Sequence, residues 1–172
     1  NINKYSITQP TNYLRHNWKS FLTEDDTFRF SADFFNKTEK IVYRQTSDKL
    51  VAALDCTQFA TDKTVHIIVP KAGTNLNLKY LLGLLNSKLF NYYFSWFKKE
   101  EGKAFAQVKT VDIKRLPFIC KFEDEMVDLV SKIILESDLL SPTAIELQSS
   151  IDNLVYKMFD LTVDEIALIE GA

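Results

Sequence analysis

The chain has 172 residues, of which 46% are hydrophobic and 26% are charged, and its formal net charge is −2. These ordinary values exclude a disordered chain, and the length suits one domain with an appendage or two small units. Lys79 and Lys88 interrupt the most apolar segment, so the sequence predicts no membrane span. The chain starts at Asn1 without a signal-peptide pattern, and we therefore expect a piece of a longer protein.

The small net charge hides an uneven distribution. Residues 1–120 carry 18 Lys and Arg against 11 Asp and Glu, whereas residues 121–172 carry 3 against 12. A basic front and an acidic tail are typical of a polyanion-binding domain joined to a separate assembly element, although two solvated faces of opposite sign would give the same pattern. We predict a boundary between these two parts near residue 120.

The two cysteines, Cys56 and Cys120, have no partner at metal-ligand spacing. Isolated thiols of this kind favour a reducing, cytoplasmic setting and buried apolar roles, although the sequence alone leaves a disulfide between them open.

The front part contains strand patterns after an aperiodic stretch over residues 1–38. In "KIVYRQTSDKLVAALD", residues 40–55, β-branched and aromatic residues flank the polar tetrad "QTSD", which predicts a β-hairpin. "KTVHIIVPK", residues 63–71, predicts a further short strand that ends at a proline. "FAQVKTVDI", residues 105–113, alternates between apolar and polar and also favours a strand.

A helix is predicted between these strands, over residues 78–98, with Asn77 as its N-cap and Gly102 as the breaker beyond its end. Its apolar stripe comprises Leu78, Leu81, Leu82, Leu85, Leu89, Tyr92 and Trp96. We expect Tyr92 and Trp96 in the core, whereas Tyr93 and Phe97 could be core residues or platforms for stacking bases.

The acidic tail has helical patterns. A helix is expected over residues 123–139, and Ser141-Pro142 begins another, since proline suits a first helical position. This second helix has a heptad-like seam of Ala144, Leu147, Ile151, Leu154 and Met158. Thr162 and Glu165 have capping-box spacing and predict a last short helix. The fold class is α+β: a small β-sheet with one long packed helix, followed by a C-terminal helical hairpin.

Motifs for catalysis are scarce. The sequence has no GxGxxG, P-loop, HExxH, CxxC or GxSxG pattern. His16 stands alone, and His66 alternates within a predicted strand, which favours a satisfied structural histidine. The acid-x-lysine triplets 101–103 and 112–114 resemble those of Mg²⁺-dependent nucleases, with Asp55 or Asp62 as the acidic partner such a site needs. Triplets like these arise easily in a lysine-rich segment, so we expect no catalysis by this chain.

Basic and amide side chains gather at the predicted turns and strands. Lysine attracts phosphate without sequence preference, whereas arginine and glutamine form paired contacts with guanine and adenine edges. A lysine run alone is more often a solvated face; amide and hydroxyl neighbours favour duplex recognition. The candidate DNA-binding residues are Arg44, Gln45, Thr46, Ser47, Lys49, Lys63, Lys103, Gln107, Lys109 and Thr110.

Several segments together resemble a known family. "KIVYRQTSDKLVAALD", "TVHIIVPK", "NLKYLLGLLNSKLFNYYF" and "FAQVKTVDIKRLPF" follow one another as in the C-terminal specificity domain of TaqI-like enzymes, and "LTVDEIALIEG" resembles the usual end of such proteins. The resemblance covers residues 40–171. These enzymes are single-chain adenine methyltransferases, often fused to a restriction endonuclease in the type IIG arrangement.

The resemblance implies a bacterial restriction-modification system. Residues 1–120 would be the target recognition domain that grips double-stranded DNA, and residues 121–172 would be spacer helices. The methyltransferase domain of the same polypeptide would bind S-adenosylmethionine, with or without Mg²⁺ in the parent enzyme, and flip out an adenine for N6 methylation. Its Asn-Pro-Pro-aromatic motif is absent from this sequence, so the resemblance implies recognition without catalysis or a cofactor here. The alternative is a protein-interaction module that self-associates through the seam of residues 144–158.

Overall fold

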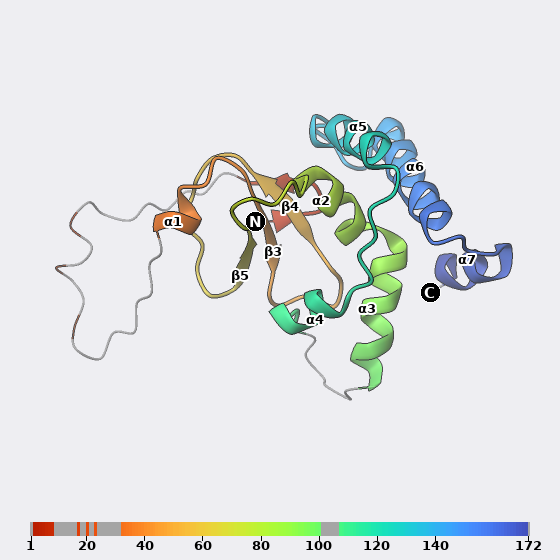
Figure 1. The fold of residues 1–172 in the computed structure, drawn as a ribbon, viewed down its shortest axis with the longest axis horizontal. Helices are drawn as coiled ribbons and strands as arrows, with labels where there is room; N and C mark the ends of the chain where they lie inside the picture. The colour runs from red at the N-terminus through yellow and green to blue at the C-terminus, as the bar shows by residue number, and fades with distance from the viewer. Residues whose placement is uncertain are drawn as a thin grey trace.

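A computed structural model describes residues 2–8, 17, 20, 23, 32–100 and 107–171. The short helix α1 and the C-terminal helices lie at opposite ends of the molecule, with the main sheet between them (Figure 1). The strands are β1 (Ile2–Asn3), β2 (Ser6–Ile7), β3 (Lys40–Arg44), β4 (Ala52–Asp55) and β5 (Val65–Ile68). The helices are α1 (Ala32–Phe35), α2 (Leu78–Asn86), α3 (Lys88–Glu100), α4 (Thr110–Arg115), α5 (Glu123–Ile134), α6 (Pro142–Met158) and α7 (Val163–Glu170).

The predicted hairpin and the predicted third strand are confirmed. β3 and β4 pair antiparallel, with Lys40 opposite Asp55 and Tyr43 opposite Ala52. β5 pairs antiparallel with the other edge of β3, which gives a three-stranded sheet of order β4-β3-β5. The α+β fold class is thereby confirmed, with α5, α6 and α7 forming the C-terminal helical region.

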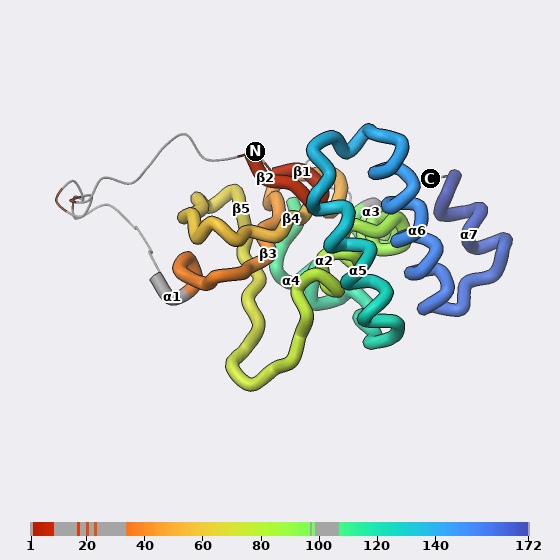
Figure 2. The backbone as a smooth tube through the Cα atoms, turned by 90° about the horizontal axis from the view of Figure 1, so that it is seen from above, coloured from red at the N-terminus to blue at the C-terminus, as the bar shows by residue number. Residues whose placement is uncertain are grey.

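The two faces of this sheet are covered by different elements. Alternate residues of β3 point to opposite faces, so Ile41 and Tyr43 belong to a large core with α2, whereas Val42 packs with Ile2 and Ala53 in a small second cluster. The short β1–β2 ribbon therefore covers one face and α2 the other. Figure 2 shows the chain from above, with β1 and β2 beside the sheet and the C-terminal helices at the far end.

The helix predicted over residues 78–98 is two helices, α2 and α3, separated at Ser87. Asn77 is its N-cap as expected, because its side chain accepts hydrogen bonds from the N–H groups of Lys79 and Tyr80. The break follows from Asn86, whose buried amide donates to the Ala52 carbonyl (2.9 Å) and accepts the Ala52 N–H (3.0 Å). These two hydrogen bonds join Asn86 to β4, and α2 ends there although the apolar pattern of the sequence continues.

The break changes which face of α3 is buried. Phe90 and Phe94 are fully buried, whereas Trp96 is 55% exposed, so the prediction that Trp96 lies in the core is wrong. Tyr92 is partly buried, and the Tyr93 side chain is exposed beside Trp96, with 6.4 Å between ring centroids. The stripe read from the sequence assumed a single uninterrupted helix. Gly102, the proposed breaker, and the side chain of Phe97 lie outside the described residues.

The strand predicted over residues 105–113 is also wrong within its described part. Gln107 makes one bridge to Thr46, and the chain then turns into α4. Asp112 is the cause, because its carboxylate accepts the Lys109 N–H at 2.7 Å and so satisfies a free donor at the helix N-terminus. Local capping outweighs the alternating pattern.

The C-terminal helices begin where the sequence predicts. Ser141 caps α6 by accepting the Ala144 N–H (3.1 Å), and Thr162 and Glu165 form the expected capping box of α7. α5 ends at Ile134, earlier than predicted. The seam of α6 faces the molecule's own core, since Ala144, Ile151, Leu154 and Met158 are all buried. Leu147, the remaining residue of the seam, is partly buried against the same core.

One hydrophobic core extends from the sheet into the C-terminal helices, and it includes Tyr43, Leu82, Val130 and Met158. α2 and α5 approach closely at Gly83, where an added Cβ would lie 2.3 Å from Met126 Sδ and 3.0 Å from Val130 Cγ2. Within the described residues no helix is long and apolar enough to cross a bilayer.

Cys56 and Cys120 are free thiols, and both are exposed, so the predicted burial is wrong. Cys56 directly follows the last residue of β4, and Cys120 lies in the connector between α4 and α5.

Candidate nucleic-acid interface

The turn between β3 and β4 is joined to two segments that are distant in sequence. The Gln45 N–H donates to the Thr64 carbonyl (2.8 Å), and the Gln45 carbonyl accepts the Val108 N–H (2.7 Å). Thr46 bridges to Gln107, and Arg44 pairs with Val65. Backbone hydrogen bonds thus hold residues 44–50, 62–65 and 107–110 side by side at one edge of the sheet.

Nine of the ten predicted DNA-binding residues belong to these three segments. The tenth, Lys103, lies outside the described residues. Those with exposed side chains are Thr46, Lys49, Lys63, Gln107, Lys109 and Thr110, and those partly buried are Arg44, Gln45 and Ser47. We call this set of nine residues the tip surface. The tertiary structure thus brings together candidate residues from three separate segments of the sequence.

The turn between β3 and β4, which carries part of the tip surface, is hydrogen-bonded to α3. Leu50 is 2% exposed, and its N–H donates to Asn91 Oδ1 on α3 at 2.8 Å. The Ser47 hydroxyl accepts the Lys49 N–H at 3.3 Å within the turn. A turn whose backbone is held in this way loses little backbone conformational entropy on binding.

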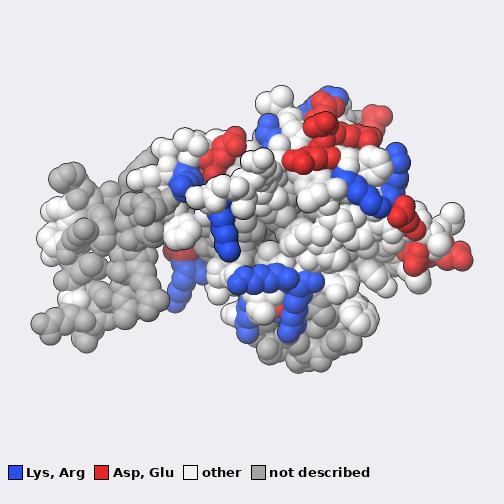
Figure 3. Space-filling view, viewed as in Figure 1, with Lys and Arg blue, Asp and Glu red and all other residues white. Residues whose placement is uncertain are grey.

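The helix α4 extends the tip surface with cationic side chains. Lys109, Lys114 and Arg115 lie on or beside it, and its one carboxylate, Asp112, is 1% exposed and pairs with Lys98 at 2.7 Å. No acidic side chain of α4 therefore faces solvent. Figure 3 shows Lys and Arg gathered over α4, whereas Asp and Glu gather over the C-terminal helices. A cationic surface separated from an acidic one in this way is of the kind that attracts polyanions.

The same geometry bears on the nuclease hypothesis. Asp112 is enclosed by a salt bridge and a backbone hydrogen bond, and Asp55 is fully buried in an ion pair with Lys40. Glu101 and Lys103 lie outside the described residues. Among the residues that the structure describes, no group of three His, Cys, Asp or Glu side chains is placed to hold a metal ion.

Behind the tip surface, Tyr43, His66 and Thr110 join the sheet to α4. The Tyr43 and His66 rings stack with 5.2 Å between centroids, and Thr110 hydrogen-bonds the Tyr43 side chain. Burial lowers the pKa of His66, and its Nε2 is enclosed without a hydrogen-bond partner in the described part of the chain. His66 thus packs against Tyr43, which is in keeping with a structural role. We expected both ring nitrogens to be hydrogen-bonded, and for Nε2 this expectation is not met within the described residues. His16 lies outside the described residues.

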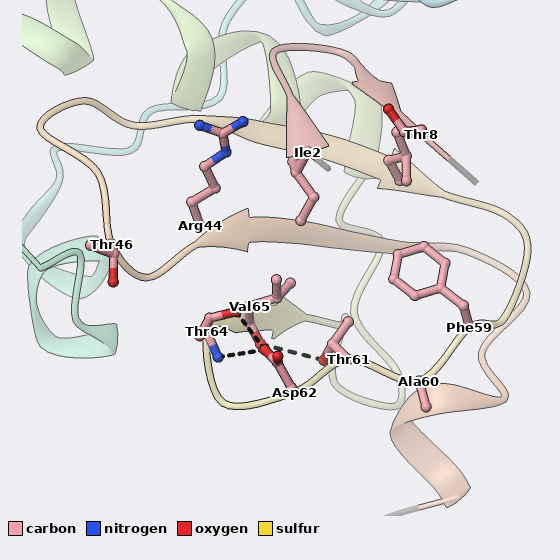
Figure 4. A pocket seen from close by; sticks show the side chains of 11 residues that line it. Ile2, Thr8, Arg44, Thr46, Phe59, Ala60, Thr61, Asp62, Thr64 and Val65 are labelled. Carbon is pink, nitrogen blue, oxygen red and sulfur yellow. Dashed lines mark hydrogen bonds between the residues drawn. The ribbon is translucent and has the colours of Figure 1, made fainter. Parts of the chain in front are cut away.

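A hollow of about 440 Å³ lies beside Arg44, between the β1–β2 ribbon and residues 59–65 (Figure 4). The Arg44 guanidinium donates to Asn3 Oδ1 at 3.2 Å. On the other side of the hollow, Asp62 Oδ1 accepts hydrogen bonds from the N–H and the hydroxyl of Thr64, which hold the pKa of the Asp62 carboxyl below its usual value. Sequence reasoning did not select Asn3 or Thr64 as site residues and considered Asp62 only as the acidic partner of a nuclease site, although "TDKT" has the composition of an Asx turn.

A second hollow, of about 570 Å³, is mostly apolar and lies on the other face of the sheet. It is lined by side chains that include Phe34, Tyr43, Leu76, Tyr80, Lys114 and Phe118. No pattern in the sequence pointed to it, because its walls come from α1, the sheet, α2, α4 and the connector that follows α4.

Comparison with known proteins places this geometry in a family. The chain matches, at 26% identity over 136 residues, a putative type II restriction enzyme and methyltransferase of Methanocaldococcus jannaschii. The alignment covers 74% of this chain but 12% of that relative. Residues 1–118 match the TaqI-like C-terminal specificity domain, and the match ends before α5, short of the resemblance expected up to residue 171. The chain belongs to the family of TaqI-like C-terminal specificity domains.

Proposed function

We propose that the chain recognises specific sequences in double-stranded DNA as the specificity domain of a restriction-modification enzyme. One observation carries the proposal: three segments distant in sequence are hydrogen-bonded into a single tip surface of Lys, Arg, Gln and Thr side chains. The acidic helices lie away from that surface (Figure 3).

The chemistry of the tip surface suits a duplex. Lys49, Lys63 and Lys109 are exposed and would neutralise phosphates, a contact that gives affinity and register without sequence preference. Arg44 and Gln107 would contact base edges, since a guanidinium pairs with guanine and a carboxamide with adenine.

Catalysis in this proposal belongs to the rest of the parent enzyme. A methyltransferase domain of the same polypeptide would bind S-adenosylmethionine and methylate adenine at N6, with or without a Mg²⁺-dependent endonuclease domain, in a bacterial cytoplasm. An enzyme that modifies a base inside a duplex must flip it out, so the specificity domain holds the duplex while the other domain takes up the adenine. The acidic helices after residue 120 would face protein, because their charge opposes contact with phosphate.

A salt titration with a pool of random-sequence duplexes tests the proposal. The 172-residue chain should bind the pool at low salt, and the logarithm of the affinity should fall linearly with the logarithm of the salt concentration, by about 0.9 for each phosphate contacted. No binding to the pool at low salt would overturn the proposal.

A further inference from the structure

The hollow beside Arg44 has an apolar floor and a polar rim. Ile2, Phe59 and Val65 line the floor, and the exposed or partly exposed side chains at the rim are Arg44, Thr46, Asp62 and Thr64. Figure 4 shows Arg44 on β3 and Asp62 on the facing loop, on different sides of the hollow. The rim thus combines one guanidinium and one carboxylate.

The backbone fixes the relative position of these two groups. Arg44 is paired with Val65 in the sheet, and the Val65 N–H donates to the Asp62 carbonyl at 3.2 Å. The Gln45 N–H also donates to the Thr64 carbonyl. Arg44 therefore lies at the end of β3 and Asp62 on the loop that leads into the neighbouring strand β5, next to the tip surface.

Each charged group keeps unused hydrogen-bonding capacity. Within the part of the chain that the structure describes, Arg44 bonds Asn3 through Nη2 alone, and Asp62 accepts through Oδ1 alone. A guanidinium has five N–H donors and a carboxylate has two oxygens, so donors of Arg44 and Oδ2 of Asp62 remain for a ligand.

The charge of Asp62 is not needed by the loop that carries it. An Asx turn needs a single side-chain oxygen, which an asparagine supplies equally well. A carboxylate also repels phosphate, so within a DNA-binding surface it fits a hydrogen-bond donor on a base and not the backbone. Cytosine N4 is the donor that acidic side chains accept from in the major groove, and guanine O6 and N7 are the acceptors that arginine contacts.

Building on the proposed function, we propose that Arg44 and Asp62 together recognise one G·C base pair in the major groove. Arg44 donates to O6 and N7 of the guanine, and Asp62 Oδ2 accepts from N4 of the cytosine paired with it. The two opposite charges match the donor and acceptor groups that this base pair presents at its major-groove edge.

The test is a selection from a random duplex library with the 172-residue chain, two test variants and one control variant. Asp62→Asn keeps the oxygen that caps the Asx turn but removes the charge. Arg44→Lys keeps the charge but loses the paired donors. Asp164→Asn, at an exposed position in the first turn of α7, removes the same charge far from the hollow and serves as the matched control.

The selected motif should contain an invariant G·C pair, and both test variants should relax the preference at that one position by about 5- to 150-fold. Arg44→Lys should retain the salt dependence of binding, because the charge is kept. Asp62→Asn should also tolerate adenine in place of the cytosine, since a side-chain amide both donates and accepts hydrogen bonds. Asp164→Asn should select the original motif.

Three results would overturn the inference while leaving DNA binding intact. These are a motif without an invariant G·C pair, variants that relax different positions, and variants that lower the affinity equally for every sequence. Absence of salt-dependent binding to any duplex would instead remove the proposed function, and this inference with it.

Discussion

The ion pairs of the sheet-bearing part (residues up to 120) and those of the C-terminal helices (residues 121–172) differ in how far they are exposed to solvent. In the sheet-bearing part, Lys40 and Asp55 are both 0% exposed, and Lys98 and Asp112 are 11% and 1% exposed. In the C-terminal helices, Lys132 and Asp128 are 58% and 61% exposed. Buried pairs cost much to break, whereas exposed pairs contribute little.

This difference bears on binding. By pairing Asp112 internally, the sheet-bearing part removes a carboxylate from the cationic surface around α4 and leaves Lys109 and Lys114 facing solvent. Apart from Asp152, which is 2% exposed, most carboxylates of the C-terminal helices lie at the surface, where they repel a polyanion. The burial of Asp112 thus increases the difference in surface charge between the two parts.

The largest effect is expected from breaking the buried pair. Lys40→Ala would leave the carboxyl of Asp55 without its cationic partner in a fully buried site and remove the hydrogen bond from Lys40 Nζ to the Phe35 carbonyl. An uncompensated buried charge costs about 3–5 kcal/mol, so the free energy of unfolding in urea should fall by that amount. Lys132→Ala is the control and should change it by less than about 0.5 kcal/mol. Equal losses in the two variants would contradict the contrast between the regions.

A second prediction concerns the junction of the two regions. Gly83→Ala places a methyl group against Met126 and Val130 where α2 crosses α5, and overpacking of this kind costs about 1–3 kcal/mol. Thermal unfolding should show the loss. Combining it with Met126→Ala should cost less than the sum of the single changes, because the new methyl then occupies vacated space. Strict additivity would show that the crossing is not tight.

A smaller effect is expected on DNA binding. Lys109→Ala should lower the slope of log affinity against log salt by about 0.9, with little dependence on the sequence of the duplex. Fluorescence anisotropy at several salt concentrations would measure the slope. Lys132→Ala, the same change on the acidic helices, should leave the slope unchanged. An equal decrease in both variants would mean that the duplex does not select the tip surface.

The smallest effect is a change in pH dependence at Asp152 of α6. Burial raises the pKa of this carboxyl, although the N–H of Lys88 and the charges of Lys4 and Lys88 oppose the shift. The folded state therefore binds the proton more tightly than the unfolded state. The contribution of Asp152 to stability is fully present below its unfolded pKa of about 3.9 and is lost as the pH rises through the raised folded pKa.

Asp152→Asn removes this titration and keeps an oxygen for the Lys88 N–H. The stability of the variant relative to the unsubstituted chain should therefore increase as the pH is raised from about 4 towards neutrality, as measured by urea midpoints. A difference that stays constant with pH would contradict the assignment.

Much of the fold could be predicted from local patterns. The hairpin over residues 40–55, the caps at Asn77 and Thr162 and the helix start at Ser141-Pro142 depend on neighbouring residues, and all of these are confirmed. The continuous helix and the strand over residues 105–113 were wrong, because Asn86 bonds the sheet and Asp112 bonds both its own helix start and Lys98. Ala52 and Lys98 are distant in sequence from Asn86 and Asp112, so these contacts could not be predicted from local patterns. The hydrogen bond from the Lys109 N–H to Asp112 is local, but it favours a helix start where the alternation of apolar residues favours a strand.

The sequence by itself determined the α+β class, the family and the residue types available for contact with phosphates and bases. The tertiary structure decided that Gln45, Thr64 and Val108 meet, that Asp112 is withdrawn from the surface, and that Arg44 and Asp62 share one hollow. The reason is physical: capping and periodicity act within a few residues, whereas a binding surface requires side chains from separate segments to be brought together by long-range backbone pairing.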